Sequence, residues 1–334
     1  MALLEVEQLT VTLQTQRGPA RAIRDVSFAV DTAGTLGIVG ESGSGKSMTA
    51  MAIMGLLPEG AKVEGSIRLG GEELTTKTDR EMNAIRGNRI GMIFQEPMTA
   101  LNPVHTIGKQ VAEPLRLHRG MNAVDARKKA IALLDRVGIP DAARRADAYP
   151  HQFSGGQRQR ITIAMALACE PSLLIADEPT TALDVTIQKQ ILELIAGLVE
   201  ERRMALMLIS HDLGVIAQNV QRMLVMYGGS VVEDGSTRSV FANRMHPYTM
   251  GLFDARPALG TPKGAKLATI PGTVPELADL PSGCTFAGRC AFTIAECHTT
   301  VPPPIEVGLG HHARCIRLDA LTPTLSRRER EQQP

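Results

Sequence analysis

The segment Gly40–Ser47, with the sequence Gly-Glu-Ser-Gly-Ser-Gly-Lys-Ser, has the residue types and spacing needed to hold a chain of phosphates. Its glycines, Gly43 and Gly45 among them, let the backbone turn so that its N–H groups point inward at an anion. The Lys46 ammonium would neutralise phosphate charge, and the Ser47 hydroxyl would ligate Mg²⁺. The segment therefore predicts a nucleotide-phosphate site. Its remaining predicted contacts are Gly40, Glu41, Ser42, Ser44 and the N–H of Met48.

Two carboxylates, Asp177 and Glu178, come directly after the apolar run Leu173–Ala176. A buried strand that ends in acidic residues places them at the carboxyl edge of a parallel sheet, where α/β proteins bind ligands. Beside a phosphate site, we expect Asp177 to hold Mg²⁺ and Glu178 to orient and deprotonate an attacking water. The pair therefore predicts hydrolysis of the bound nucleotide.

The elements that must position these residues are visible as short apolar runs in the first 240 residues. Such runs suit strands buried on both faces of a parallel sheet. They are Leu36–Val39, Ile90–Phe94, Leu173–Ala176, Ala205–Ile209 and Met223–Met226. Helical patterns lie between them, at Thr186–Arg203 and at Asn122–Val137, where Asn122 can cap the helix and Gly138 can end it. The alternation of strand and helix predicts an α/β fold.

Residues 1–30 follow a different pattern, because apolar and polar residues alternate there on both sides of a Gly18-Pro19 turn. This alternation is typical of strands with one solvated face. Together with Gly65–Gly71, it predicts a small antiparallel sheet beside the core.

Composition limits the function. The 334 residues include 36 Lys+Arg and 35 Asp+Glu, which gives a formal charge of +1, and 3 % aromatic residues without tryptophan. Neither nucleic acid nor an anionic membrane surface is favoured as a partner at this charge. All apolar runs are shorter than the roughly 18 residues needed to span a bilayer. The N-terminus carries acids where a signal peptide is basic, so we expect a cytosolic protein.

Four cysteines, Cys284, Cys290, Cys297 and Cys315, are clustered near the C-terminus, whereas Cys169 stands alone. Thiols grouped in a cytosolic protein suggest a metal. Their spacing fits neither common zinc patterns nor bacterial ferredoxin runs, so an iron–sulfur cluster, zinc and free thiols all stay open on spacing alone. Nearby histidines that could substitute as ligands are His298, His311 and His312.

The sequence Phe153-Ser-Gly-Gly-Gln157 resembles the signature of ATP-binding-cassette (ABC) ATPases. Other residues of that family follow in its order, namely Gln95, the triplet Ala182-Leu-Asp184 and His211. The resemblance implies that the nucleotide is ATP and that Gln95, Asp184 and His211 take part in catalysis, with Gln95 also near Mg²⁺. It further implies that a second subunit's γ-phosphate is bound by four residues of this chain, Ser154, Gly155, Gly156 and Gln157.

Three further stretches, Ile93–Pro103, Thr180–Gln188 and His246–Thr249, are similar to the ATPases of dipeptide, oligopeptide and nickel importers, especially the dipeptide-permease type. This likeness implies import of di- or oligopeptides across a bacterial or archaeal inner membrane, with the chain peripheral on its cytoplasmic face. The implied partners are a second, paralogous ATPase in a heterodimer, two membrane permease subunits and an extracytoplasmic binding protein. It also favours a [4Fe–4S] cluster at the four cysteines.

Two alternatives stay open. The same machinery could import nickel, glutathione or another small solute, or the chain could be a soluble cassette acting on DNA or ribosomes. The second is disfavoured by the near-zero charge and by the lack of long coiled coils or a second cassette in the sequence.

The family's architecture implies a P-loop cassette with a RecA-like mixed-sheet core and an N-terminal antiparallel β subdomain, spanning residues 1–240. A helical signature subdomain is expected at about 97–168, a small loop-rich extension at 241–318, and a disordered tail at 319–334. The sequence departs from the family in one respect, because residues 1–27 contain no aromatic residue to stack on adenine. We expect Arg21 or an aliphatic residue to replace it.

Overall fold

A computed structural model describes residues 1–181, 183–255 and 269–321. Two sheets form its framework, a four-stranded sheet of order β2-β1-β4-β5 and an eight-stranded sheet of order β11-β12-β10-β9-β3-β8-β7-β6. The strands of the large sheet that precede residue 240 are β3 (Thr35–Val39), β6 (Ile90–Ile93), β7 (Leu173–Asp177), β8 (Ala205–Ser210), β9 (Arg222–Tyr227) and β10 (Ser230–Ser236).

The middle of the large sheet is parallel, because β9, β3, β8, β7 and β6 pair with one another in the same direction. Each coincides, within two residues at either end, with an apolar run identified in the sequence. All residues of β6, β7 and β8 are buried, as expected for strands covered by helices on both faces. The predicted α/β fold is confirmed.

The small sheet is antiparallel, as the alternation in residues 1–30 predicted. Its strands are β1 (Ala2–Thr15), β2 (Gly18–Asp31), β4 (Lys62–Leu69) and β5 (Glu72–Glu73). The turn between β1 and β2 lies earlier than expected, at Gln16 and Arg17, because Thr15 pairs with Gly18 and its hydroxyl donates to the Gly18 carbonyl at 2.7 Å. As a result Arg17 stands at the tip of this hairpin.

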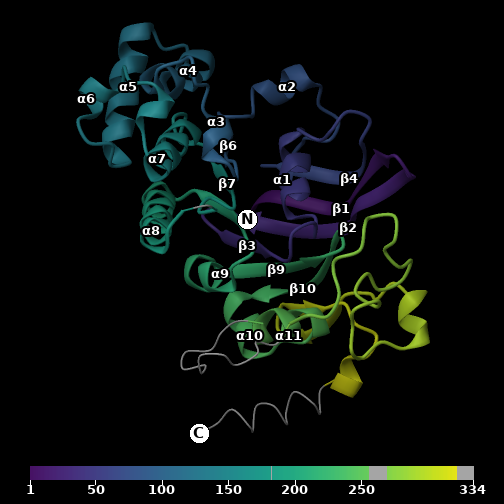
Figure 1. Cartoon of the computed structure of the whole chain (residues 1–334). Helices are drawn as coiled ribbons and strands as arrows, with labels where there is room; N and C mark the ends of the chain where they lie inside the picture. Colours follow the sequence, from purple (N-terminus) through teal and green to yellow (C-terminus); the bar gives the residue numbers. More distant parts are fainter. Residues whose placement is uncertain (182, 256–268, 322–334) are drawn as a thin grey trace, which may run out of the picture.

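Helices form a separate group between β6 and β7, to the upper left in Figure 1. They are α3 (Pro97–Ala100), α4 (Ile107–Arg119), α5 (Ala123–Arg136), α6 (Ala142–Arg145), the 3₁₀ turn η1 (Pro150–Gln152) and α7 (Gly155–Ala166). The Asn122 side chain caps α5 by accepting from the Asp125 N–H, as its sequence predicted. These helices lie within residues 97–166, and the bounds of the helical subdomain stay a prediction.

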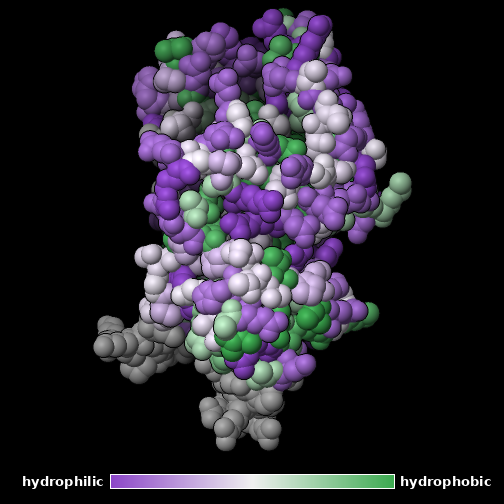
Figure 2. All heavy atoms as spheres, turned by 90° about the vertical axis from the view of Figure 1, so that its right-hand side faces the viewer, coloured by the Kyte–Doolittle hydropathy of each residue, from purple (hydrophilic) through white to green (hydrophobic). Residues whose placement is uncertain are grey.

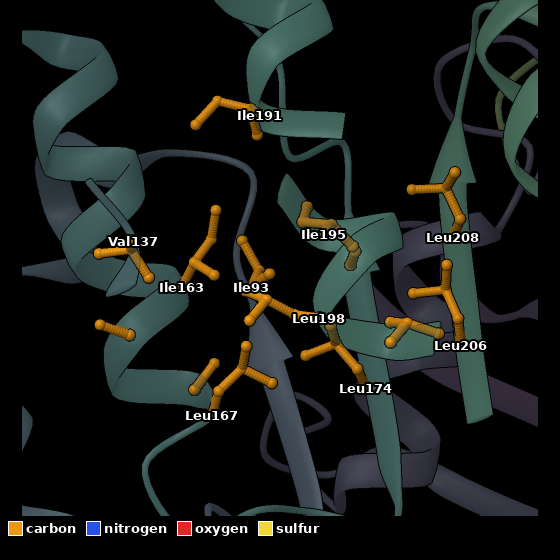
Figure 3. Packing of buried hydrophobic residues seen from close by; sticks show 14 of the residues in the cluster. Ile93, Val137, Ile163, Leu167, Leu174, Ile191, Ile195, Leu198, Leu206 and Leu208 are labelled. Atoms are coloured by element: carbon orange, nitrogen blue, oxygen red, sulfur yellow. The ribbon is translucent and has the colours of Figure 1, made fainter. Parts of the chain in front are cut away.

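The remaining helices lie against the sheets or follow the strands of the core. They are α1 (Lys46–Met54), α2 (Asp79–Asn83), α8 (Val185–Arg202), α9 (Leu213–Asn219), α10 (Thr237–Ala242), α11 (Pro247–Asp254) and the 3₁₀ turn η2 (Ala295–His298). Figure 3 shows how α7 and α8 pack on the strands, with Ile163 and Ile195 directed toward the side of the sheet that carries Leu174. Within the described residues, no helix is both long and apolar enough to cross a membrane.

The C-terminal extension joins the large sheet. Strand β12 (His311–Ala313) pairs antiparallel with β10, and β11 (Ile305–Gly308) pairs with β12. A buried contact fixes this junction, since His311 Nε2 lies 2.8 Å from Glu233 Oε1 on β10. Figure 2 views the molecule from the side of the extension and shows hydrophobic residues gathered in the lower part of this face. Most of the expected tail, from residue 322 onward, lies outside the described residues.

Candidate functional site

The residues of the predicted phosphate cradle form the loop between β3 and α1. Gly43 and Gly45 have φ angles of 78° and 105°, and Gly45 caps α1. Such angles are accessible to glycine at little cost, and they turn the loop back over the start of the helix. The Lys46 side chain is 5 % exposed, and its Nζ donates to the carbonyl oxygens of Gly40 at 2.8 Å and Glu41 at 2.9 Å. The ammonium therefore sits at the centre of the loop.

Ser47 and Asp177 meet at the end of β7. The Ser47 hydroxyl donates to Asp177 Oδ1 at 3.0 Å, and Asp177 is 4 % exposed. Burial raises the pKa of the Asp177 carboxyl, and burial likewise lowers the pKa of Lys46. Burial thus disfavours both charged forms, and the attraction between the Lys46 ammonium and the Asp177 carboxylate partly offsets this effect. A hydroxyl and a carboxylate side by side are suitable Mg²⁺ ligands.

Three polar side chains contact the carboxylate of Glu178. Its Oε2 accepts from the Thr181 hydroxyl at 2.9 Å and from Gln95 Nε2 at 3.3 Å, and it lies 3.2 Å from His211 Nδ1. The carboxylate is 13 % exposed, and the residue has a φ of 45°. A left-handed backbone at a residue with a Cβ costs about 1–2 kcal/mol, a strain that is concentrated at functional sites.

Of these side chains, Lys46, Ser47, Gln95 and Glu178 line one cavity of about 320 Å³. Its lining is made of Ala22, Ser42, Gly43, Gly45, Lys46, Ser47, Met48, Gln95, Glu178 and Leu277. The predicted loop and the predicted strand-end acid therefore lie at the same place, although the sequence separates Lys46 from Glu178 by more than 130 residues. The arrangement can hold phosphates beside a carboxylate able to accept a proton from water.

The residues Ser154–Gln157 do not line this cavity. Ser154 is exposed and caps α7, where its hydroxyl accepts from the Gln157 N–H at 3.4 Å. Asp184 is also exposed and caps α8 by accepting from the Ile187 N–H at 3.0 Å. Its predicted neighbour Ala182 lies outside the described residues. Both segments therefore begin helices on an exposed part of the surface.

Known proteins resemble this chain over most of its length. Residues 23–181 match the family described as "ABC transporter", and residues 232–297 match "Oligopeptide/dipeptide transporter, C-terminal region". A putative peptide import ATP-binding protein of Brucella melitensis is 53 % identical, over 94 % of this chain and 97 % of that protein. The chain belongs to the peptide-import ATP-binding proteins of the ABC transporter family. It is therefore an ATPase.

Other relatives of this peptide-import ATPase agree. The oligopeptide transport ATP-binding protein OppD of Mycobacterium bovis is 48 % identical over 96 % of this chain, which spans 52 % of that protein. Among solved structures, the dimeric bacterial ABC transporter cassette MJ0796 is 31 % identical with a TM-score of 0.63, covering 70 % of this chain and 99 % of that one. The cassette architecture expected from the sequence is thereby confirmed.

Two contacts of the ATPase were missed by sequence reasoning, and both involve Glu41 of the cradle. The buried Tyr248 hydroxyl accepts from the Glu41 N–H at 2.8 Å. The Arg289 guanidinium donates to both Glu41 carboxylate oxygens, at 2.7 and 3.2 Å. Tyr248 lies in the stretch His246–Thr249 that carried the family resemblance, but that pattern says nothing of its contact. No motif or pattern in the sequence around Arg289 indicates its contact with Glu41.

The prediction of a [4Fe–4S] cluster is wrong. In the part of the chain that the structure describes, which includes all four cysteines of the extension, no group of three or more His, Cys, Asp or Glu side chains is placed to hold a metal ion. These are the free thiols Cys284, Cys290, Cys297 and Cys315. The spacing left three interpretations open, and the one that agrees with the structure is free thiols.

Burial keeps the thiols of the extension protonated. It raises the pKa of Cys284 to about 11, and it raises the pKa values of Cys290 and Cys315 as well. Thiols of raised pKa stay protonated at neutral pH. The cavity that the thiols line with Phe286 has a volume of about 20 Å³, which is room for about one water molecule.

Proposed function

We propose that this ATPase hydrolyses ATP with Glu178 as the general base and thereby powers the import of di- or oligopeptides. The observation that supports it is the environment of Glu178, whose Oε2 lies within 3.3 Å of Thr181 Oγ1, Gln95 Nε2 and His211 Nδ1. Three polar groups on one oxygen hold the carboxylate in a fixed orientation toward the phosphate cavity. The other oxygen, Oε1, is then the proton acceptor for the attacking water.

The cradle would bind the triphosphate and Mg²⁺. Lys46 would turn from the carbonyl oxygens of Gly40 and Glu41 to the phosphates. The Ser47 hydroxyl, Asp177 and Gln95 would face the magnesium ion, which when bound neutralises charge on the phosphates. A bound cation would also compensate the buried Asp177 carboxylate, whose pKa burial raises.

The active unit in this proposal is a pair of cassettes. Ser154, Gly155, Gly156 and Gln157 do not line the cavity of their own chain, and the N-terminus of α7 presents backbone N–H groups and a positive dipole end on the surface. In a head-to-tail pair these groups would bind the γ-phosphate held by the partner's cradle. Asp184, at the exposed N-terminus of α8, would lie in the same interface. The similar cassette MJ0796 is described as dimeric.

Outside the ATPase pair, we propose two membrane permease subunits and an extracytoplasmic binding protein as partners, with the pair on the cytoplasmic face of the membrane. The relatives named for peptide import and oligopeptide transport support peptides as the solute. Pairing with a paralogue rather than a second copy is part of the proposal. We also propose that the chain divides into a cassette at 1–240 and an extension from residue 241.

The test is Glu178→Gln in the complete transporter. The amide keeps the size of the side chain but cannot accept the proton, so hydrolysis should fall by about 10²–10⁴-fold while ATP still binds. Steady-state phosphate release and ATP binding by calorimetry measure the two effects. A variant that hydrolyses ATP at the wild-type rate would disprove the role of Glu178.

A matched control is Glu193→Gln on α8, where the same change affects an exposed carboxylate paired with Lys189 at 3.7 Å. This variant should keep the wild-type rate. Transport of a labelled dipeptide into vesicles, compared with a nickel salt and glutathione, tests the solute class. Uptake of nickel or glutathione without the peptide would refute peptide import.

A further inference from the structure

Next to the phosphate cavity lies a second cavity of about 500 Å³. One side is the tip of the β1–β2 hairpin, at Thr15, Gln16 and Arg17. The other side is a segment of the C-terminal extension, Val274–Ala278, and the floor is Ser42 and Gly43 of the cradle. Arg21, one of the two expected contacts for adenine, lines neither this cavity nor the phosphate cavity.

The two cavities adjoin each other. Three residues line both of them, namely Ser42, Gly43 and Leu277. The phosphate cavity has Glu178 and Gln95 at its reactive end, so the γ-phosphate belongs there. The rest of a bound nucleotide must extend away from Glu178, past the cradle, and the adjoining space in that direction passes Leu277.

The extension segment is held against the hairpin by charge pairs. Arg17 donates to both carboxylate oxygens of Asp279, at 2.8 and 2.7 Å, and to Glu276 Oε2 at 3.2 Å. A bidentate pair fixes geometry as well as distance. Behind the segment, the Arg289 side chain donates to the backbone carbonyl of Pro271 at 2.8 Å. Leu277 is therefore carried by a segment that is anchored on both sides.

We propose that Leu277 packs against the base of bound ATP, so that the C-terminal extension completes the nucleotide pocket and supplies the contact that residues 1–27 lack. The inference rests on the proposed function, since it takes ATP as the ligand. Val274 and Pro275 add apolar surface to the same wall. A flat, largely apolar base fits a pocket with an aliphatic wall, because both surfaces lose contact with water on binding.

An aliphatic wall binds a base differently from an aromatic one. Burial of apolar area is non-directional, whereas ring stacking adds a preferred geometry. Leu277 should therefore contribute affinity for the base and little for the phosphates, which the cradle binds on its own. That difference separates the effect of Leu277 from any general damage to the site.

The experiment uses the full-length chain and two ligands, ATP and inorganic tripolyphosphate, with affinities measured by calorimetry. Leu277→Ala removes most of the aliphatic surface, and we expect about tenfold weaker ATP binding. Tripolyphosphate has no base, so its affinity should not change. Leu277→Phe offers a ring in place of the aliphatic side chain and should bind ATP at least as tightly as the wild type.

The matched control is Leu309→Ala, because Leu309 belongs to the same extension and is fully exposed. It should leave both affinities unchanged. An unchanged ATP affinity in Leu277→Ala, or an equal loss for ATP and tripolyphosphate, would overturn the inference while leaving the proposed function intact. A wild-type chain that binds neither ligand would instead refute the proposed function, and this inference with it.

Discussion

Arg289 of the extension and Glu41 of the phosphate cradle form a bidentate ion pair, although 248 residues separate them in the chain. The Arg289 side chain is 5 % exposed and that of Glu41 is 31 % exposed. The same guanidinium donates to the carbonyl oxygen of Pro271, and the Glu41 N–H is held by Tyr248. The second residue of the cradle is thus anchored from two places in the C-terminal third of the protein.

Replacing Arg289 by methionine should lower the free energy of unfolding by about 2 kcal/mol, because it leaves a partly buried carboxylate without its partner. Urea denaturation measures the change, and ATP binding should weaken with it. The control is Arg144→Met, since the Arg144 side chain is 83 % exposed in its pair with Asp141 and such pairs contribute at most about 1 kcal/mol. Equal losses in the two variants would mean that the Glu41 pair adds no stability of its own.

The residues of the cradle could be predicted from the sequence, whereas the contacts of Glu41 with Tyr248 and Arg289 could not. The cradle and the strand end at Glu178 are specified by consecutive residues, so motif and apolar pattern predicted both. The contacts of Glu41 depend on side chains from distant segments, and no periodicity or spacing links Tyr248 or Arg289 to the loop. The proposed contact of Leu277 with the base depends on a distant segment in the same way, because Leu277 lies in the extension and the cradle begins at Gly40.

A methyl group at Gly40 should disrupt the cradle. A Cβ built there would lie 2.2 Å from the Met226 carbonyl oxygen, so backbone must shift to admit it. We expect Gly40→Ala to weaken ATP binding by at least tenfold, or about 1.4 kcal/mol. Calorimetry with ATP measures the loss, and binding at the wild-type level would show that the loop can move without consequence.

The matched control is Gly197→Ala on α8, where a Cβ would meet no atom within 4 Å. Alanine is the better helix former, so this variant should be more stable than the wild type by up to about 1 kcal/mol. ATP binding should not change. The same substitution should therefore weaken ATP binding at Gly40 and leave it unchanged at Gly197.

His246 should make the protein sensitive to acid. It is 1 % exposed, its Nδ1 accepts from the Tyr248 N–H at 3.1 Å, and burial lowers its pKa to about 3. In the unfolded chain its pKa is about 6.5, so the unfolded state binds the extra proton first as the pH falls. Stability from this residue is complete above about pH 6.5 and is lost toward pH 3, by about 1.4 kcal/mol per pH unit.

Unfolding by urea between pH 7.5 and pH 5 measures this slope. His246→Asn keeps a side-chain acceptor at the N-terminus of α11 but does not titrate, so its stability should fall less steeply than that of the wild type. His151→Asn removes an exposed histidine and should keep the wild-type slope. Parallel slopes for wild type and His246→Asn would show that another group controls the acid response.

The free thiols show where the expectation of an iron–sulfur cluster, which came from the importer resemblance, is wrong. Four cysteines near one another in sequence suggested ligands, yet the extension is fixed by other means, namely β12 beside β10 and the ion pairs of Arg17 and Arg289. A short apolar-poor segment can be ordered by pairing with an existing sheet, which needs no metal. The spacing of cysteines carries no information on such pairing.

The Arg289–Glu41 pair also has a consequence for the order of events during synthesis. A ribosome makes the chain from its N-terminus at about 5–20 residues per second, so Arg289 follows Glu41 by roughly 10–50 s. Throughout that interval the nascent cradle lacks its anchor, and β10 has no β12 beside it. We therefore expect nascent chains that have not reached the extension to bind ATP more weakly than the finished chain.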